Sequence, residues 1–160
     1  MQYLLMILAV AGITVLDQWT KFWVVENIPL YSQMDAIPGL FHLTYVQNTG
    51  AAFSILQGAQ WFFALIFLVL TVLIVWDMAK KSMPFTKFER WLVVLVYAGG
   101  LGNMIDRVRL GYVVDMIEVD FMSFPVFNVA DCFITCGCIA LMAHLVLCNK
   151  AFWKDGKKKN

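Results

Sequence analysis

Residues 59–79 read AQWFFALIFLVLTVLIVWDMA, and this run is apolar over almost its whole length. A helix needs roughly 20 apolar residues to cross the hydrocarbon core of a bilayer, and this run supplies them. Three further apolar runs approach the same length, over residues 2–25, 90–107 and 129–149. The sequence therefore predicts four membrane-spanning helices joined by short connections, in one integral membrane domain over residues 1–160.

The composition of the whole chain also indicates a membrane protein. Of its 160 residues, 61% are hydrophobic and 14% are charged, with a mean hydropathy of +0.74. That apolar share is too large for the core of one small soluble domain. The net charge of +1 lacks the basic footprint of a nucleic-acid-binding protein, so we expect no nucleic acid as a partner. We expect a monomer in contact with membrane lipid.

Two features resemble signals of other protein classes. The four cysteines lie in the last apolar run: Cys132, Cys136, Cys138 and Cys148. They lack the spacing of a metal site, so we interpret them as small hydrophobic side chains and expect neither a metal nor another cofactor.

Tyr3–Leu16 is apolar like a signal-peptide core, but no basic segment precedes it and the helix pattern continues. We interpret it as a retained helix.

The basic residues indicate how the chain is oriented. All Lys and Arg except Lys21, Arg107 and Arg109 lie between the second and third runs or after the fourth. Because cytoplasmic loops carry an excess of Lys and Arg, this distribution places residues 80–90 and both termini in the cytoplasm. The connections between the other runs then face outward.

The first outward-facing segment has a pattern typical of β-structure. Phe41–Val46 is rich in β-prone residues, and the turn signal Asn48-Thr49-Gly50 follows it. Residues 51–56 are again mostly apolar. We expect a small β element within residues 27–58 that turns at Asn48–Gly50 and packs at the membrane surface.

In the second outward-facing segment, strand periodicity separates one acidic residue from two others. With a period of two, Asp115 shares a strand face with Val113 and Ile117. Glu118 and Asp120 lie on the opposite face, which we expect to meet water. Asp115 is therefore an acid among apolar neighbours.

Polar side chains gather toward one face of the membrane. Polar groups at membrane depth are costly and are therefore candidates for function. The outward ends of the runs and their connections contribute Asp17, Lys21, Asn48, Asn103, Asp106, Arg107, Asn128 and Asp131. The inward half is almost purely apolar, and we interpret its Asp77 as a helix-end acid beside Lys80 and Lys81. The sequence thus predicts a polar site near the outer face.

Several of these residues also have purely structural interpretations. Asp17 and Lys21, at positions i and i+4, fit a pair that neutralises itself. Asn128 and Asp131 fit an N-cap followed by an acid at the third helical position. Arg107 fits a side chain that reaches the outer headgroups. A role in a site stays open for each of them.

The residue types exclude some kinds of catalysis and favour one. The two histidines, His42 and His144, lie far apart in the predicted topology, so no Ser or Cys is paired with a His base. Two carboxylates, Asp115 and Asp131, can meet at an apolar interface. Because two close carboxylates cannot both ionise easily, one keeps a proton and the other can act as a base toward water. Such a pair can hydrolyse an amide without a covalent intermediate.

Five ordered motifs resemble those of lipoprotein signal peptidase, the signal peptidase II family. They are Asp17–Lys21, Asn48–Ser54, Gly99–Arg107, Gly111–Asp115 and Phe127–Asp131. The resemblance extends over essentially the full chain. It departs from many relatives at Met116, where they have Phe, and this difference changes local packing.

The resemblance implies a four-helix membrane aspartyl endopeptidase with an outer β element that cradles the substrate. Such an enzyme removes the signal peptide of bacterial prolipoproteins before a diacylglyceryl-modified cysteine, at the outer face of the inner membrane. The implied catalytic pair is Asp115 and Asp131. The residues implied to bind substrate or support the site are Asp17, Asn48, Gly99, Asn103, Arg107 and Asn128, although Gly99 is most simply a close-packing residue. The family inhibitor globomycin is expected to bind.

Two other functions fit parts of the pattern. Buried acids with an Arg also form proton relays, so a small proton-coupled transporter or channel is the main alternative. A conduction path needs polar residues through both leaflets, however, and the inner half offers almost none. A non-enzymatic membrane assembly factor with glycine-rich helix faces is the third interpretation.

Overall fold

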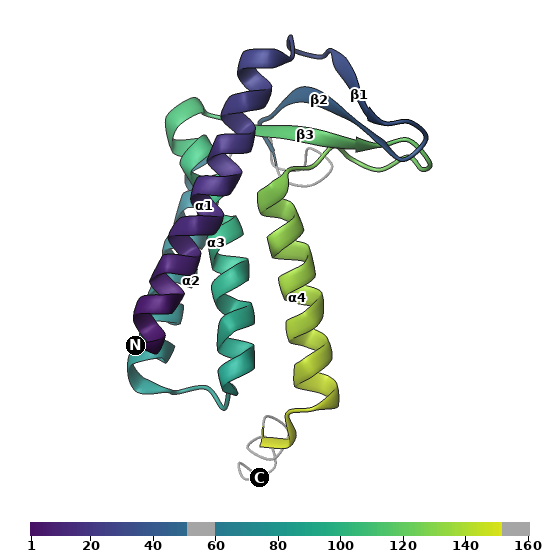
Figure 1. Ribbon diagram of the computed structural model, residues 1–160. Coiled ribbons are helices and arrows are strands. Elements are labelled where there is room, and N and C mark those ends of the chain that lie inside the picture. The colour runs from purple at the N-terminus through teal and green to yellow at the C-terminus, as the bar shows by residue number, and fades with distance from the viewer. Residues whose placement is uncertain (51–59, 152–160) are drawn as a thin grey trace.

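The computed structural model describes residues 1–50 and 60–151. Its elements are α1 (Gln2–Asn27), β1 (Gln33–Ile37), β2 (Phe41–Asn48), α2 (Gln60–Lys80), α3 (Lys87–Leu110), β3 (Val113–Val119) and α4 (Val129–Leu147). The four helices form a bundle with the three strands at one end, which we call the sheet end (Figure 1). The N-terminus, the α2–α3 connection and the last turn of α4 lie at the opposite end, which we call the loop end.

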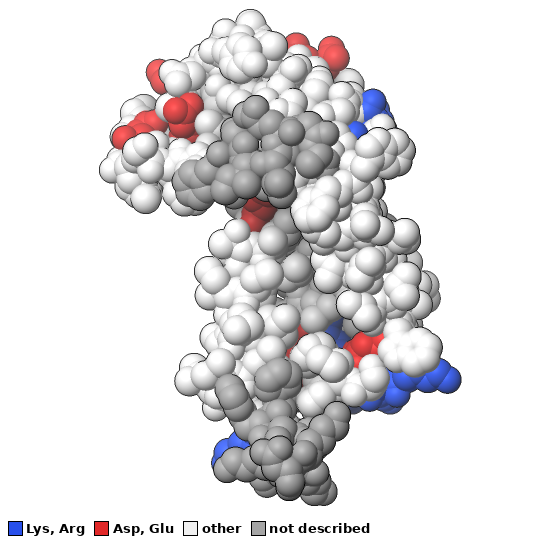
Figure 2. Space-filling model, turned by 180° about the vertical axis from the view of Figure 1, so that it is seen from behind, with Lys and Arg blue, Asp and Glu red and all other residues white. Residues whose placement is uncertain are grey.

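Three of the helices, α1, α2 and α4, are long and apolar enough to cross a membrane. In α2, Asp77 is the one buried residue, so most of the apolar surface of this helix faces away from the other helices. Figure 2 shows helices that are mostly uncharged, with basic side chains gathered at the loop end. Helix α3 forms where the span over residues 90–107 is predicted, but its charged side chains keep it out of this apolar set. It contacts each of the other three helices and is the centre of the bundle.

Small residues allow α3 to approach its neighbours closely. A Cβ atom added to Gly99 would lie 2.5 Å from the carbonyl oxygen of Ala130 in α4, and one added to Gly102 would overlap the carboxylate of Asp17. From the other side, a Cβ on Gly137 would lie 2.7 Å from a methyl group of Val96. The packing interpretation of Gly99 is therefore confirmed, and the beginning of α4 lies against the second half of α3.

Local signals fix the ends of α3 and α4. Helix α4 begins with a capping box, in which the Asn128 side chain accepts a hydrogen bond from the Asp131 amide at 3.0 Å and the Asn128 backbone amide donates one to the Asp131 carboxylate at 3.1 Å. This confirms the predicted N-cap. Helix α3 ends at Gly111, whose φ of 81° is in the left-handed region that favours glycine. That reversal directs the chain straight into β3.

The strands form an antiparallel sheet in the order β1-β2-β3. Val114 and Met116 of β3 pack with Tyr45 of β2 and with Val24 and Ile28 at the end of α1. This apolar cluster anchors the sheet to the bundle. In the ladder, Val46 of β2 lies opposite Asp115 of β3, so the first half of β3 is covered by β2.

The structure adds a hairpin that was not predicted from the sequence. The hairpin in the described chain turns at residues 38–40, where Gly39 has a φ of 74°, and β1 pairs with β2 from the N-terminal side. Strand β1 carries no strong β signal in the sequence, because its five residues are all exposed and gain order by pairing with β2. The amide of Gly50 does bend back to the Asn48 side chain, at 2.9 Å. The strand expected at 51–56 lies outside the described residues.

The water-facing side of β3 is also smaller than predicted. Val114 and Met116 share the face assigned to water, yet both are buried against α1 and β2. Glu118, farther along, has a side chain that is 34% exposed and contacts His42 of β2 at 3.0 Å. Asp120 contacts the other ring nitrogen of the same histidine. Both acids therefore lie away from the neighbours of Asp115.

Candidate active site

The structure brings the two predicted catalytic carboxylates to one pocket at the sheet end. Asp115 comes from β3 and Asp131 from the first turn of α4, and both line a cavity of about 500 Å³. Asn48, Asn103 and Arg107 line the same cavity. Residues that are far apart in sequence therefore meet here, as the motifs predicted.

Amide groups hold all four carboxylate oxygens of the pair. Asn128 donates from its side chain to Asp115 at 2.7 Å and from its backbone to Asp131 at 3.1 Å, so it bridges the two acids. Asn48 donates to the second Asp115 oxygen at 3.0 Å. Asn103 donates to the second Asp131 oxygen at 2.8 Å. Because a carboxylate oxygen has two lone pairs, each retains capacity for water or substrate.

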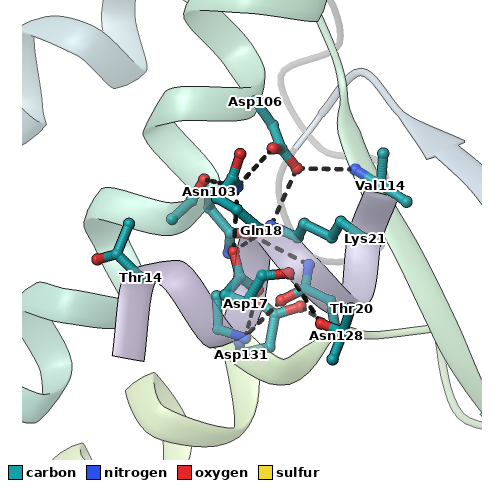
Figure 3. Close-up of polar contacts among 12 residues, drawn as sticks. Thr14, Asp17, Gln18, Thr20, Lys21, Asn103, Asp106, Val114, Asn128 and Asp131 are labelled. Carbon is teal, nitrogen blue, oxygen red and sulfur yellow. Dashed lines mark hydrogen bonds and ion pairs between the residues drawn. The ribbon is translucent and has the colours of Figure 1, made fainter. Parts of the chain in front are cut away.

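A buried lysine lies behind this pair (Figure 3). The Lys21 ammonium is 2.9 Å from Asp17, 2.9 Å from Asp106 and 2.8 Å from the side-chain oxygen of Asn103. These three acceptors use all three ammonium donors. Because the Asn103 oxygen accepts from Lys21, the NH₂ group of that amide is directed to Asp131. Lys21, together with the Asn128 side chain that donates to the same oxygen at 3.1 Å, orients the amide that holds Asp131.

Asp17 connects the lysine to the beginning of α4. It is completely buried, and its second oxygen accepts from the Ala130 amide at 3.0 Å, next to Asp131. Asp17 therefore supports the pair from behind. The predicted Asp17–Lys21 pair is present, and Gly99 packs against the carbonyl of Ala130. A substrate-binding role for Asp17 or Gly99 stays a prediction.

Two further polar residues support the site: Asp106, which the sequence placed among the polar side chains without a role of its own, and Gln18, which the sequence did not single out. Asp106 accepts from Lys21 and, at 3.2 Å, from the backbone amide of Val114, so it fixes β3 beside Asp115. Gln18 donates to Asp106 at 2.8 Å. Asp106 lies three residues after Asn103 on one helix face, and this spacing is the signal in the sequence that could have placed it beside Asn103.

Burial raises the pKa of Asp115 to about 6, and the neighbouring negative charge of Asp131 acts in the same direction. The hydrogen bonds from Asn48 and Asn128 and the charge of Lys21 oppose this rise, because they favour the ionised form. Asp115 is consequently able to hold a proton much closer to neutral pH than an ordinary aspartate.

Arg107 links the pocket to α2 and to the chain just after β2. Its guanidinium donates to the carbonyl of Gly50 at 2.8 Å and lies 4.6 Å from the centre of the Phe63 ring. Its Nε atom is buried and has no hydrogen-bond partner among the described residues. An unpaired buried donor is costly, so it is available for a carbonyl oxygen that enters the pocket.

Apolar side chains form much of the remaining wall. The β3–α4 connection contributes Phe124, Pro125, Val126 and Phe127, and α4 contributes Cys132, Ile134, Thr135 and Cys136. The sequence did not assign these residues to the site, because their chemistry is that of ordinary membrane-exposed positions. The pocket therefore combines a polar floor with apolar sides.

Comparisons with known proteins agree with this geometry. The family model of signal peptidase (SPase) II matches residues 9–147. The "Lipoprotein signal peptidase" of Streptococcus thermophilus is 47% identical over 152 residues, which are 93% of this chain and 90% of that protein. The protein of the same name from Enterococcus faecalis is 46% identical, over 89% of this chain and 87% of its own length.

Solved structures show the same fold. A bacterial membrane enzyme determined at 2.3 Å resolution superposes with a TM-score of 0.80 at 32% identity, over 97% of this chain and 91% of that chain. A second, at 1.9 Å resolution, gives a TM-score of 0.79 at 33% identity, over 91% and 94% of the two chains. The family model alone matches most of the sequence. This chain therefore belongs to the signal peptidase II family.

Proposed function

We propose that this protein removes signal peptides from prolipoproteins by hydrolysing a peptide bond between Asp115 and Asp131. The observation that carries the proposal is that Asn128 bridges two carboxylates above one pocket. Family membership supplies the reaction, and the pocket supplies the groups that can perform it. Nothing in the comparisons favours the transporter alternative.

In the proposed mechanism, Asp131 is the base and Asp115 is the acid. A water molecule attacks the scissile carbonyl carbon while Asp131 takes a proton from it and Asp115 donates its proton to the carbonyl oxygen. Asp131 then gives its proton to the departing nitrogen, and Asp115 regains a proton from the hydroxyl as the new carboxyl group forms. The raised pKa of Asp115 supports this assignment, because the acid must hold a proton at the start.

The surrounding residues position the peptide. The Nε donor of Arg107, which has no partner among the described residues, can bind a substrate carbonyl, and Asn48 reaches the pocket from the end of β2. Phe124 and its neighbours offer an apolar wall beside the acids. Two acyl chains on a substrate cysteine gain about 0.8 kcal/mol for each CH₂ kept in hydrocarbon. We infer that the preferred substrate carries a diacylglyceryl group and reaches the pocket laterally from the membrane.

The function also requires an orientation in the bilayer. Helix α3 lies at the centre of three apolar helices, so we infer that it crosses the membrane as a fourth span. Basic side chains at the loop end favour the cytoplasm for that end and the outer face of the inner membrane for the pocket. In a variant without the native cysteines, an impermeant thiol probe should label Ser123→Cys from outside and Ser82→Cys only from inside. The reverse pattern would exclude lipoprotein processing.

Purified protein in detergent should be given a diacylated prolipoprotein and, separately, the same polypeptide without lipid. We expect cleavage before the modified cysteine in the first case and poor cleavage or none in the second, with globomycin blocking the reaction. Asp131→Asn is the control for a contaminating protease. Equal rates on both substrates, lost in Asp131→Asn, would leave a protease but reject lipoprotein maturation as its role.

A further inference from the structure

Two of the four cysteines lie in the wall of the catalytic pocket. Cys132 follows Asp131 directly, and Cys136 is one helical turn farther along α4; both line the cavity of about 500 Å³. Cys138 instead lines an apolar groove bounded by α2, α3 and α4, and Cys148 follows the end of α4. All four thiols are free. The interpretation of the cysteines as simple hydrophobic side chains is therefore incomplete for the first two.

The positions of these thiols give them access to the space that a substrate must enter. Residues at i and i+4 share one face of a helix, so both sulfur atoms belong to the same side of α4 as the pocket. Cys136 is exposed, and Cys132 is partly buried. The opposite wall, Phe124–Phe127, is also part of this cavity. A group attached to either sulfur would occupy volume beside Asp131.

We propose that Cys132 and Cys136 form a covalent modification site for small, uncharged electrophiles of the α,β-unsaturated carbonyl class, and that the adduct closes the catalytic pocket. The thiol loses its proton to water, and the thiolate sulfur bonds to the β-carbon of the alkene. The π electron pair moves to the α-carbon, which takes a proton from water. The sum is addition of one thiol across one double bond, without an oxidant.

The charges in the pocket select the class of reagent and the order of reaction. Asp131 and Asp115 disfavour an anionic reagent, whereas the apolar wall favours an uncharged one. Cys132 adjoins Asp131 and is partly buried, which limits the approach of a reagent to its sulfur atom. Cys136 is a turn farther away and more exposed, so it is the faster site.

The remaining cysteines provide matched controls in the same molecule. Cys138 lies only two residues beyond Cys136 but lines the other groove, and Cys148 lies at the loop end. Two double variants follow: Cys132→Ser/Cys136→Ser, which lacks the pocket thiols, and Cys138→Ser/Cys148→Ser, which keeps them. Each is compared with its own untreated sample, so an effect of the substitution on basal activity cancels.

The test treats purified protein in detergent with N-ethylmaleimide and measures prolipoprotein cleavage together with the mass of each cysteine-containing peptide. We expect the wild type and Cys138→Ser/Cys148→Ser to lose most activity in step with labelling of Cys136. The Cys132→Ser/Cys136→Ser variant should keep most of its own activity under the same treatment. Equal inactivation of both double variants, or full activity with Cys136 labelled, would overturn the proposal.

A second measurement separates this inference from the proposed function on which it rests. In Asp131→Asn, which should not turn over, added diacylated prolipoprotein is expected to slow labelling of Cys136 and leave labelling of Cys148 unchanged. If the untreated wild type does not cleave prolipoprotein, the proposed function fails. If it cleaves but prolipoprotein leaves labelling of Cys136 unchanged, the modification site at the pocket is rejected.

Discussion

The same capping motif begins two helices at opposite ends of the bundle, with different outcomes. At the loop end, Glu89 caps α3 and is fully buried; His144 donates to one of its oxygens at 2.8 Å and Asn149 to the other at 2.7 Å. At the sheet end, Asp131 caps α4 in the same way but faces a cavity beside a second carboxylate. A capping acid thus becomes a candidate catalyst through its neighbours.

Each end of the bundle also has a buried cation, and the two cations have different partners. At the loop end, Arg90 pairs with Asp77, so the predicted association of Asp77 with the adjacent lysines is wrong. At the sheet end, Lys21 contacts two carboxylates and the amide that holds Asp131. At the loop end, the Arg90–Asp77 pair joins α3 to α2. At the sheet end, Lys21 and its partners orient groups toward an open pocket.

The largest expected effect comes from the two pocket acids. Asp115→Asn and Asp131→Asn should each lower kcat by about 10²- to 10⁴-fold, because general acid or base catalysis is usually worth that much. The measurement is release of signal peptide from diacylated prolipoprotein in detergent, with folding checked by thermal unfolding. Turnover near the wild-type rate in either variant would remove the pair from the mechanism.

Replacing the buried cation should have different consequences at the two ends of the bundle. Lys21→Met and Arg90→Met each leave a buried carboxylate without its cation, which typically costs about 3–5 kcal/mol of stability. Both variants should unfold at lower temperature, but only Lys21→Met should also lose kcat in the protein that remains folded, because Asn103 loses the shorter of the two hydrogen bonds that orient its amide. Equal kcat in the two folded variants would contradict the orienting role of Lys21.

Neutralising the loop-end capping acid should affect stability alone. Glu89→Gln keeps the size of the side chain but weakens the bond to His144, at a cost of about 1–3 kcal/mol. We expect a lower unfolding temperature with kcat/KM of the folded protein unchanged. A loss of kcat as deep as that of Asp131→Asn would mean that the two ends are not functionally distinct.

The smallest effect on activity is expected from Glu118, on the face of β3 opposite Asp115. Glu118→Gln alters a half-exposed contact with His42, on the opposite strand face from Asp115. It should change kcat/KM by no more than about threefold, as surface substitutions usually do. Steady-state kinetics on diacylated prolipoprotein provide the check. A loss comparable to that of Asp115→Asn would show that the strand register is assigned wrongly.

The sequence predicted the features that depend on local pattern. Long apolar runs marked the helices, and the Asn128–Asp131 spacing marked the beginning of α4. The alternation of side chains around Asp115 placed it on a different strand face from Glu118. These features could be predicted because each signal lies in neighbouring residues. The motifs then indicated which residues meet at the site.

Features that depend on partners distant in sequence were harder to predict. Strand β1 has little β signal of its own and is ordered by β2. The burial of Val114 and Met116 depends on the end of α1, which strand periodicity cannot reveal. Asp106 gained its role only when Lys21 was found within 2.9 Å of it. Contacts between helices, not local propensity, determine these cases.

The central claim is that Asp115 and Asp131 act as a pair in which Asp115 holds the proton, and the pH dependence of kcat/KM tests it most directly. That parameter reports pKa values of the free enzyme. Because the acid must be protonated, activity should be present below the Asp115 pKa of about 6 and fall as the pH rises through it. Asn48→Ala removes a hydrogen bond that favours the charged form, so the fall should move to higher pH. A profile without a fall in this region, or one that Asn48→Ala leaves in place, would contradict the account.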